Sequence, residues 1–314
     1  MTQTSGRDHG GGVDAAANRY GGQRRDWLDL STGINPCPYP VTRIPPEAWT
    51  ALPDTSAQEA LVNAARRFWS VPARAAALAA PGASALIARI PQLAPAARVH
   101  IPTPTYNEHA AAFVQDGWEL SETDPAARVL VHPNNPDGRI WLPADLDGAA
   151  LRIIDESFCD IAPDRSLIAE TSRPDTLVLK SFGKFWGLAG LRLGFAIGDP
   201  ALVDRLARML GPWPVSGPAM HIGRQALEDS AWATATRTRL EEESARLDRL
   251  MHNHGAIVGG TPLFRLYQVA DAARFQDRLA RHRIWTRIFP YSRRWVRLGL
   301  PGTKADWTRL ESAL

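Results

Sequence analysis

One lysine of this chain stands in a segment whose residue types suit covalent chemistry. Of the 36 lysine and arginine residues, only three are lysines: Lys180, Lys184 and Lys304. A lysine amine forms imines with carbonyl compounds, whereas the guanidinium of arginine does not. Lys184 has a hydroxyl side chain, Ser181, three residues before it and Arg192 eight residues after it. In a chain whose other cations are nearly all arginine, a lysine here indicates chemistry that arginine cannot perform; the alternative is a solvated lysine beside a glycine-rich turn.

The segment from Ser181 to Arg192 resembles the lysine segment of the fold-type-I pyridoxal phosphate (PLP) enzymes, the aspartate aminotransferase-like superfamily. The resemblance implies that Lys184 forms a Schiff base with the aldehyde of PLP. It also implies that Ser181 and Arg192 bind the cofactor phosphate, and a hydroxyl donor with a guanidinium fork suits a dianion. A Ser-x-x-Lys pattern alone is weak, so the rest of the chain has to supply the other PLP ligands.

An acidic residue is expected to face the pyridine nitrogen of PLP, because this nitrogen has to stay protonated for the ring to accept electrons. Residues 151–155 have the pattern of a buried strand, and α/β proteins place ligands at the carboxyl ends of strands. Asp155 is the candidate at that end; the alternative is an aspartate that caps the next helix. Upstream, an apolar run at 129–131 precedes the turn sequence Asn135-Pro136-Asp137-Gly138. The resemblance implies that Asn135 hydrogen-bonds the phenolic oxygen of PLP, although the motif alone is an ordinary turn signal.

Two earlier segments supply candidates for the phosphate and for the face of the ring. Residues 76–80 read as a strand that leads through a glycine turn into a helix start at Ala83 and Ser84. Free backbone N–H groups at a helix start favour an anion, so the Ala83 backbone and Ser84 are phosphate candidates; the alternative is an ordinary βα turn. Tyr106 follows a short strand, and the resemblance implies that it stacks on the pyridine face rather than filling the core. The order of these elements along the chain predicts PLP as the cofactor, and no metal site is expected.

Four further segments resemble the threonine-phosphate decarboxylases of cobalamin biosynthesis, especially the aerobic-pathway type. They are Asp8 to Gly12, Trp27 to Pro36, Gly211 to Ala219 and Arg294 to Pro301. The likeness runs from residue 8 to the C-terminus. Histidinol-phosphate aminotransferases share the PLP elements and also bind a phosphorylated amine, so they are the nearest alternative family.

This resemblance implies a set of substrate-binding residues. Arg297 is expected to bind the α-carboxylate, because a planar guanidinium fits a planar carboxylate with two hydrogen bonds. Arg287 is expected to bind the substrate phosphate, with Arg293 or Arg294 as alternatives. A glycine-rich terminus is often merely mobile, but two N-terminal segments are expected to close over the substrate. The residues expected to do so are His9, Gly33 and Asn35.

Two positions depart from the broader superfamily. Many aminotransferases carry a tyrosine three residues after the pyridinium aspartate, whereas this chain has Phe158, which has no hydroxyl to share the phenolic oxygen. Phenylalanine at this position favours decarboxylation over transamination without deciding between them. Many relatives also carry a tyrosine before a Pro-Asp pair that reaches the phosphate in the partner subunit. Here that position is Leu52, which cannot donate the hydrogen bond.

The predicted function is decarboxylation of L-threonine O-3-phosphate to (R)-1-aminopropan-2-yl phosphate, with a small phosphorylated amino acid as substrate. The alternative is an aminotransferase of the histidinol-phosphate type. A non-catalytic PLP-binding or partner-binding protein is a third possibility. The presence of Lys184, Asp155, Asn135 and Arg192 together argues against it.

Composition limits the class of protein. The net charge is +3 and the pI is about 9.1, but there is no dense basic run, so anionic small molecules are favoured over nucleic acid. No apolar run approaches the length of a membrane span, and no signal peptide is evident. Cys37 and Cys159 form no motif and are expected to be reduced in the cytoplasm. The resemblance implies a homodimer.

Alternating strand and helix patterns predict an α/β fold. Strand-like runs occur at 76–80, 98–101, 127–131, 151–155, 176–180 and 193–197. The family implies a seven-stranded, mostly parallel sheet with one antiparallel strand, followed by a smaller α+β C-terminal domain. The expected domains are residues 1–44, an arm packing on the small domain; 45–212, the PLP-binding domain; and 213–314, the small domain. The transition is placed at the proline- and glycine-rich stretch near 212.

Overall fold

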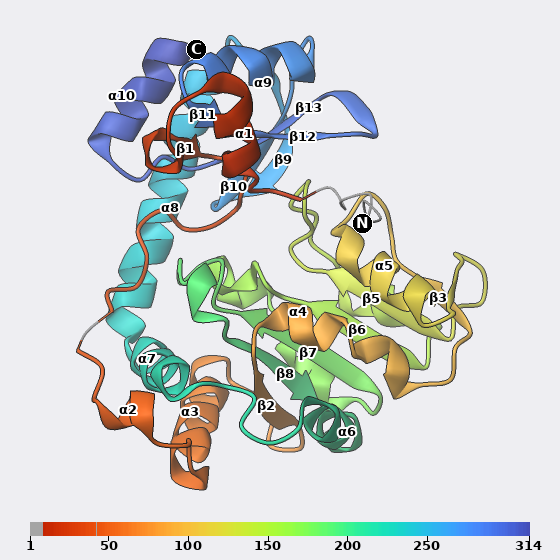
Figure 1. Ribbon diagram of the computed structural model, residues 1–314. Helices are drawn as coiled ribbons and strands as arrows, with labels where there is room; N and C mark the ends of the chain where they lie inside the picture. Colours follow the sequence, from red (N-terminus) through yellow and green to blue (C-terminus); the bar gives the residue numbers. More distant parts are fainter. Residues whose placement is uncertain (1–8, 42) are drawn as a thin grey trace. The chain divides into compact units, whose positions relative to one another are not determined.

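The computed structural model describes residues 9–41 and 43–314, which form two compact units (Figure 1). The large unit comprises residues 38–135 and 139–236. The small unit comprises the remaining described residues: those up to Cys37, the turn Pro136–Gly138, and Arg237–Leu314. The N-terminal part of the predicted arm, including Asp8, lies outside the described residues.

A seven-stranded sheet forms the centre of the large unit. Its strands, in spatial order, are β2 (Ala76–Ala80), β8 (Gly194–Gly198), β7 (Thr176–Ser181), β6 (Leu151–Asp155), β5 (Ala127–Val131), β3 (Arg98–His100) and β4 (Glu119–Leu120). β8 runs antiparallel to both of its neighbours, and the other pairs are parallel. The predicted fold class, with one antiparallel strand, is confirmed. β4 escapes prediction because two residues carry no periodicity.

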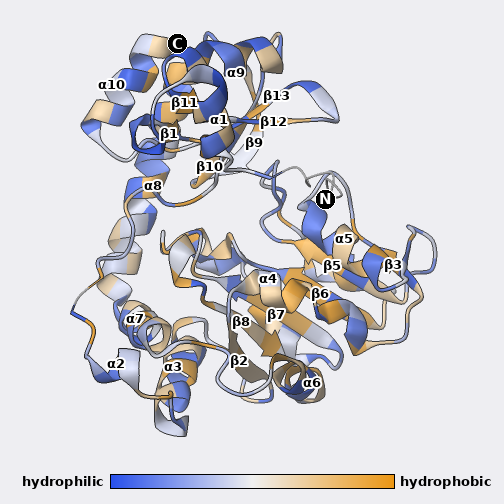
Figure 2. Ribbon diagram, in the orientation of Figure 1, coloured by the Kyte–Doolittle hydropathy of each residue, from blue (hydrophilic) through white to orange (hydrophobic). Residues whose placement is uncertain are grey.

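The central strands are mostly apolar, because helices cover a mostly parallel sheet on both faces. In β7 the side chains from Thr176 to Lys180 are all buried, and Figure 2 shows hydrophobic colouring on the central strands. β5, β6 and β7 point the same way, so their carboxyl ends lie at one edge of the sheet. Asp155 ends β6 at this edge, and the segments that follow β5 and β7 carry Asn135 and Lys184.

Helices surround this sheet. Those of the large unit are α2 (Glu47–Thr50), α3 (Thr55–Phe68), α4 (Ala83–Ile87), α5 (Asn107–Gln115), α6 (Pro200–Leu210) and α7 (Gly217–Glu228). Short 3-10 helices of this unit cover Ile90–Leu93, Pro143–Leu146, Cys159–Ile161, Pro163–Arg165, Ile168–Ser172 and Ala189–Leu191; one of the small unit covers Arg24–Asp26. Sequence signals explain several starts: the carboxylates of Asp54 and Asp199 and the hydroxyl of Ser216 accept backbone N–H groups of α3, α6 and α7.

The division between the units falls at residue 236, inside helix α8 (Ser230–Met251), rather than at the predicted 212/213. The reason is packing: α7 lies against α3 and belongs to the large unit. At Gly223 of α7 a side chain would overlap Leu193 and press on Leu61 of α3, so glycine permits the close approach. Prolines near 212 therefore mark a bend in the large unit.

The small unit contains a four-stranded antiparallel sheet in the order β12 (Arg287–Phe289), β13 (Ser292–Gly299), β10 (Phe264–Gln268) and β9 (Ala256–Thr261). β1 (Leu28–Asp29) pairs in parallel with β11 (Ile284–Trp285). Its further helices are α1 (Val13–Tyr20), α9 (Ala272–Arg281) and α10 (Lys304–Ala313). Val13, Ala16 and Trp27 of the arm pack on Ala280 of α9. The arm up to Cys37 thus belongs to the small unit, whereas 38–44, assigned to the same arm from the sequence, fall in the large unit.

The turn Pro136–Gly138 belongs to the small unit although the chain on both sides belongs to the large one. Gly260 of β9 donates a backbone hydrogen bond of 2.7 Å to Asp137. Gly138 has a φ of +75°, and a Cβ there would overlap the carbonyl of Gly260.

Among the described helices, none combines the length and apolar character needed to cross a membrane.

Candidate active site

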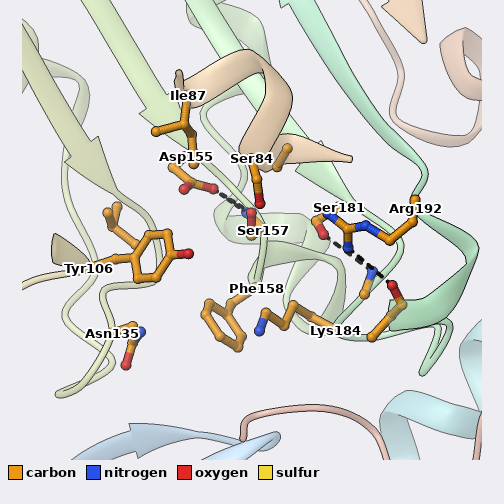
Figure 3. A pocket seen from close by; sticks show the side chains of 14 residues that line it. Ser84, Ile87, Tyr106, Asn135, Asp155, Ser157, Phe158, Ser181, Lys184 and Arg192 are labelled. Carbon is orange, nitrogen blue, oxygen red and sulfur yellow. Dashed lines mark hydrogen bonds between the residues drawn. The ribbon is translucent and has the colours of Figure 1, made fainter. Parts of the chain in front are cut away.

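A pocket of the large unit gathers side chains from the carboxyl ends of three parallel strands and from the start of α4 (Figure 3). All the residues predicted from the sequence to bind a cofactor line it: Ala83, Ser84, Tyr106, Asn135, Asp155, Ser181, Lys184 and Arg192. Further lining residues, not singled out as cofactor ligands from the sequence, are Ile87, Val131, Ser157, Phe158, Gly183 and Ala189. The topology produces this convergence, because the carboxyl ends of parallel strands share one edge of the sheet.

Asp155 is a buried carboxylate held in its ionised form. Its Oδ2 lies 2.8 Å from Nε2 of His109, and its Oδ1 accepts hydrogen bonds from the hydroxyl and the backbone N–H of Ser157, at 2.5 Å and 3.0 Å. Burial alone would raise the pKa of Asp155, but the bonds from His109 and Ser157 outweigh burial and lower it. An ionised carboxylate only accepts hydrogen bonds, so Nε2 of His109 carries a proton.

His109 is a functional candidate that the sequence did not single out. It is 1% exposed and lies on α5, three residues after Tyr106, which is the N-cap residue of that helix. The rings of Tyr106 and His109 meet edge to face at 6.1 Å. The only available sequence signal was this i, i+3 spacing, and a lone histidine is too common for it to carry weight.

The amine of Lys184 points into the same pocket. Its Nζ lies 5.2 Å from the ring centre of Phe158, and Figure 3 shows Asn135 and Tyr106 on the other side of that ring. Phe158 is 4% exposed, so it presents an apolar surface to the amine. The position at which many superfamily members have a phenolic hydroxyl is therefore hydrocarbon here.

The opposite end of the pocket collects donors for an anion. The hydroxyls of Ser84 and Ser181 and the guanidinium of Arg192 lie there (Figure 3). α4 begins at Ala83, and the first N–H groups of a helix have no partner within the helix. Gly82 has a φ of +85°, and a Cβ there would lie 2.6 Å from Nη2 of Arg192, so glycine allows the guanidinium to approach the turn.

The predicted substrate residues all lie in the small unit. Arg287 of β12 and Arg297 of β13 are directly paired across the two strands. Nη2 of Arg297 donates a 2.7 Å hydrogen bond to the backbone oxygen of Ser31, and the side chain is 5% exposed. Burial, together with the positive charge of Arg287, lowers the pKa of Arg297 to about 10. Two neighbouring guanidinium groups of which one is desolvated favour an anionic ligand.

The N-terminal candidates have different environments. His9 is exposed, and its backbone oxygen accepts a hydrogen bond from Nη1 of Arg287. Gly33 is buried. The side-chain oxygen of Asn35 accepts hydrogen bonds from the backbone N–H of Cys37 at 3.0 Å and from Arg239 at 2.7 Å. Asn35 therefore fixes its own segment, and that function explains its burial without a substrate.

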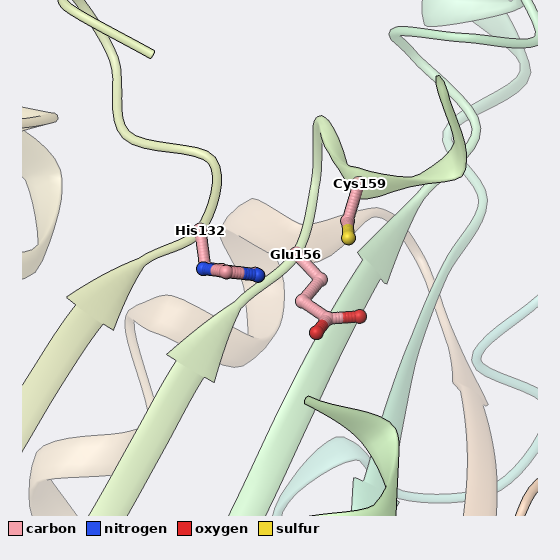
Figure 4. Close-up of side chains that lie close together, drawn as sticks. All are labelled: His132, Glu156 and Cys159. Carbon is pink, nitrogen blue, oxygen red and sulfur yellow. The ribbon is translucent and has the colours of Figure 1, made fainter. Parts of the chain in front are cut away.

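A second polar cluster of the large unit has the residue types of a metal site (Figure 4). The ligand atoms of His132, Glu156 and Cys159 lie within 4.8 Å of one another. Both ring nitrogens of His132 are engaged, with the Trp141 N–H at 3.1 Å and the Arg165 carbonyl at 2.7 Å. Glu156 is paired with a lysine, and burial raises the pKa of the Cys159 thiol. We therefore assign no metal to this cluster.

Comparison with known proteins identifies the family. Residues 46–314 match the family of class I and II aminotransferases. The chain belongs to this family. It is 40% identical to the threonine-phosphate decarboxylase of Pseudomonas aeruginosa, over 98% of this chain and 97% of that protein. The family resemblance inferred from the sequence is thereby confirmed.

Solved structures of this family share the fold. Histidinol-phosphate aminotransferase from Sinorhizobium meliloti, in complex with pyridoxal-5'-phosphate, superposes with a TM-score of 0.80 at 18% identity, covering 100% of this chain and 96% of that one. L-threonine-O-3-phosphate decarboxylase from Porphyromonas gingivalis gives a TM-score of 0.73 at 19% identity, covering 90% and 97%. At these identities the likeness establishes the fold of a class I and II aminotransferase and does not distinguish the reactions.

Proposed function

We propose that this chain is a lyase that decarboxylates L-threonine O-3-phosphate to (R)-1-aminopropan-2-yl phosphate, a step of cobalamin biosynthesis. The observation that carries the proposal is 40% identity to a threonine-phosphate decarboxylase over nearly the full length of both chains. The pocket supplies the chemistry, since it holds the Lys184 amine and the ionised Asp155 carboxylate together. The histidinol-phosphate aminotransferase alternative has less support, because such relatives match this chain at 26% identity over 72% of its length, or at 30% over only 38%.

The cofactor is pyridoxal 5'-phosphate, and the pocket fits it. The aldehyde requires an amine, which Lys184 provides, and the protonated pyridine nitrogen requires a buried anion, which Asp155 provides. Ser84, Ser181, Arg192 and the backbone at Ala83 would hold the phosphate. Tyr106 would cover one face of the ring, and Asn135 would donate to its phenolic oxygen. When bound, PLP accepts the electron pair that is left at the substrate Cα when a bond breaks.

The surrounding residues decide which bond breaks. The bond at Cα that stands perpendicular to the ring plane is the one that is weakened. Arg297, bound to the α-carboxylate, and Arg287, bound to the phosphate, would hold the carboxylate in that direction, so that CO2 leaves. The amine of Lys184 would be the proton donor to Cα, and Asp155 would hold the proton on the pyridine nitrogen. His109 and Ser157 keep Asp155 ionised throughout.

Product analysis tests the reaction. The PLP-loaded protein is incubated with L-threonine O-3-phosphate, and CO2 and amine are measured together. One CO2 per aminopropanol phosphate supports the decarboxylase. Conversion of the cofactor to its pyridoxamine form with histidinol phosphate, and no CO2, would assign the chain to transamination instead.

We further propose that the protein is a homodimer and that it is cytoplasmic. The exposed apolar side chains of Trp49, Leu52 and Trp213 are consistent with the homodimer.

Gly194→Ala is expected to weaken PLP binding by about tenfold or more, because misplacing a phosphate-binding segment loses several donors together. A Cβ at Gly194 would lie 2.6 Å from the backbone nitrogen of Ala83 and would push away the start of α4. Gly190→Ala is the matched control, because it lies just before β8 in the chain and no heavy atom lies within 4 Å of the added Cβ. Absorbance titration with PLP measures both, and equal affinities for the two variants would contradict the role of α4.

Arg287→Ala is expected to lower kcat/KM for L-threonine O-3-phosphate by about 10- to 100-fold, as expected for a lost charged hydrogen bond. The rate with unphosphorylated L-threonine should change little. Steady-state kinetics with both substrates measure the difference. Arg274→Ala is the control, since this exposed arginine of α9 belongs to the same unit and is not a candidate for the phosphate. Equal losses with the two substrates would exclude Arg287 as the phosphate ligand.

A further inference from the structure

A buried carboxylate lies close to the pocket without lining it. Asp160 is 4% exposed and follows Phe158 by two residues. Its two oxygens accept hydrogen bonds from two different indole rings: Oδ1 from Nε1 of Trp69 at 2.8 Å, and Oδ2 from Nε1 of Trp186 at 3.0 Å. Two indole donors on one buried carboxylate fix its orientation, because each oxygen is committed to a different direction.

The hydrogen bonds of Asp160 connect the two segments that carry the reactive groups of the pocket. Trp186 is two residues after Lys184, whereas Asp160 belongs to the segment that begins at Asp155. Lys180, four residues before Lys184, lies 3.6 Å from Asp160 and 2.6 Å from Glu156. The Lys184 loop is therefore tied to the Asp155 segment on both sides of the lysine.

The second oxygen of Glu156 is also engaged in this network. It accepts the backbone N–H of Leu167 at 2.6 Å, and the hydroxyl of Ser166 donates to the oxygen that pairs with Lys180. Burial would lower the pKa of Lys180, but the charges of Glu156 and Asp160 outweigh burial and raise it. Lys180 is thus a permanently charged buried cation held by two acids, and removing either acid would leave charge uncompensated.

Aromatic packing prevents the loop from moving separately from these bonds. Trp186 is fully buried and stacks on Phe182 and on Trp232, with interplanar angles of 13° in both cases. Phe185 meets Trp186 edge to face at 5.2 Å. Lys184 is thus flanked by three buried aromatic side chains, and the indole N–H of Trp186 is the polar anchor of this group.

We propose that Asp160 is a positioning residue for Lys184, which acts by holding the indole of Trp186 and thereby the backbone from which the lysine side chain extends. The proposal rests on the proposed PLP function for its effect on catalysis, but the positioning itself is a property of the chain alone. A reacting group misplaced by about 1 Å can lose about a hundredfold in rate, so the anchor has a catalytic consequence beyond folding.

The chain offers a matched pair of variants. Trp186→Phe and Trp69→Phe each replace an indole by a phenyl ring, and each removes one N–H donor from the same carboxylate. Only Trp186 belongs to the Lys184 loop, whereas Trp69 follows the end of α3. We expect comparable losses of thermal stability in the two variants. Trp186→Phe should slow imine formation with PLP by about tenfold or more, and Trp69→Phe by less than about twofold.

A readout without cofactor separates this proposal from the PLP assignment. The chain has three lysines, of which Lys180 is buried and Lys304 is exposed. Acylation of the cofactor-free full-length chain, quantified by mass spectrometry across pH, therefore reports on Lys184 with Lys304 as the internal reference. Trp186→Phe should shift the Lys184 pH profile relative to Lys304, and Trp69→Phe should leave it unchanged. If the wild-type chain failed to bind PLP but the two variants still differed in this way, the PLP assignment would be wrong and the positioning role of Asp160 would be retained.

A double-mutant cycle tests whether Asp160 acts through Trp186. Asp160→Asn keeps the size of the side chain but leaves one oxygen for two indole donors. If the effect passes through Trp186, the double variant Asp160→Asn/Trp186→Phe should have the same Lys184 pH profile as Trp186→Phe alone. Asp160→Asn should still change the Lys184 pH profile when it is added to Trp69→Phe. The proposal would be overturned if Asp160→Asn changed the Lys184 pH profile equally when added to Trp186→Phe and to Trp69→Phe. It would also be overturned if the change in Lys184 reactivity in each variant simply tracked its loss of thermal stability.

Discussion

Replacement of Lys184 by alanine is expected to reduce decarboxylation of L-threonine O-3-phosphate by at least about a thousandfold, because both covalent attachment of the cofactor and proton return to Cα are lost. The fold should persist, since Lys184 lines the pocket rather than the core. CO2 release at saturating substrate measures the change, and reduction with borohydride followed by peptide mapping identifies the modified lysine.

The control for this substitution is Lys304→Ala. Lys304 is exposed at the start of α10, and its removal should leave both activity and labelling unchanged. Lys180→Ala is not a suitable control, because Lys180 is buried between two acids and its loss would disturb the core. A Lys184→Ala protein with the wild-type rate would exclude the proposed mechanism, whatever the state of its cofactor.

Replacement of Asp155 by asparagine should lower kcat by about 10²- to 10⁴-fold, because a neutral amide cannot keep the pyridine nitrogen protonated. Asparagine is isosteric with aspartate and can still accept a hydrogen bond from Ser157, so cofactor binding should be weakened less than turnover. Rapid-mixing measurements of CO2 release and PLP titration separate the two effects. A variant that binds PLP and retains full turnover would remove Asp155 from the pyridinium position.

The same substitution makes a prediction about stability in acid. The pKa of Asp155 in the folded protein is below its ordinary value near 3.8, so ionisation favours the folded state. This contribution is present at neutral pH and is lost as the pH falls below 3.8 through the lowered pKa. The thermal unfolding temperature of the wild-type protein should therefore fall more steeply with decreasing pH in this range than that of Asp155→Asn. If the unfolding temperatures of the two proteins fell in parallel as the pH decreased, Asp155 would contribute nothing to the loss of stability in acid.

The sequence by itself determined the fold class and those pocket residues that belong to short local motifs. β5, β6 and β7 are short, mostly apolar segments that alternate with helix-compatible ones, so the edge of the sheet that carries Asn135, Asp155 and Lys184 could be predicted. The family, assigned from the same motifs, is confirmed by the comparison. These features are local in sequence, and local patterns report on local structure.

What the sequence did not show depends on contacts between distant segments. His109 reaches Asp155 across 46 residues, and Trp69 reaches Asp160 across 91. The turn Pro136–Gly138 joins the small unit through a glycine contact with Gly260, and α7 joins the large unit through its packing on α3. None of these partners has a spacing that a motif could encode. The tertiary structure alone decided them, because burial and hydrogen bonding are satisfied only when the chain has brought the segments together.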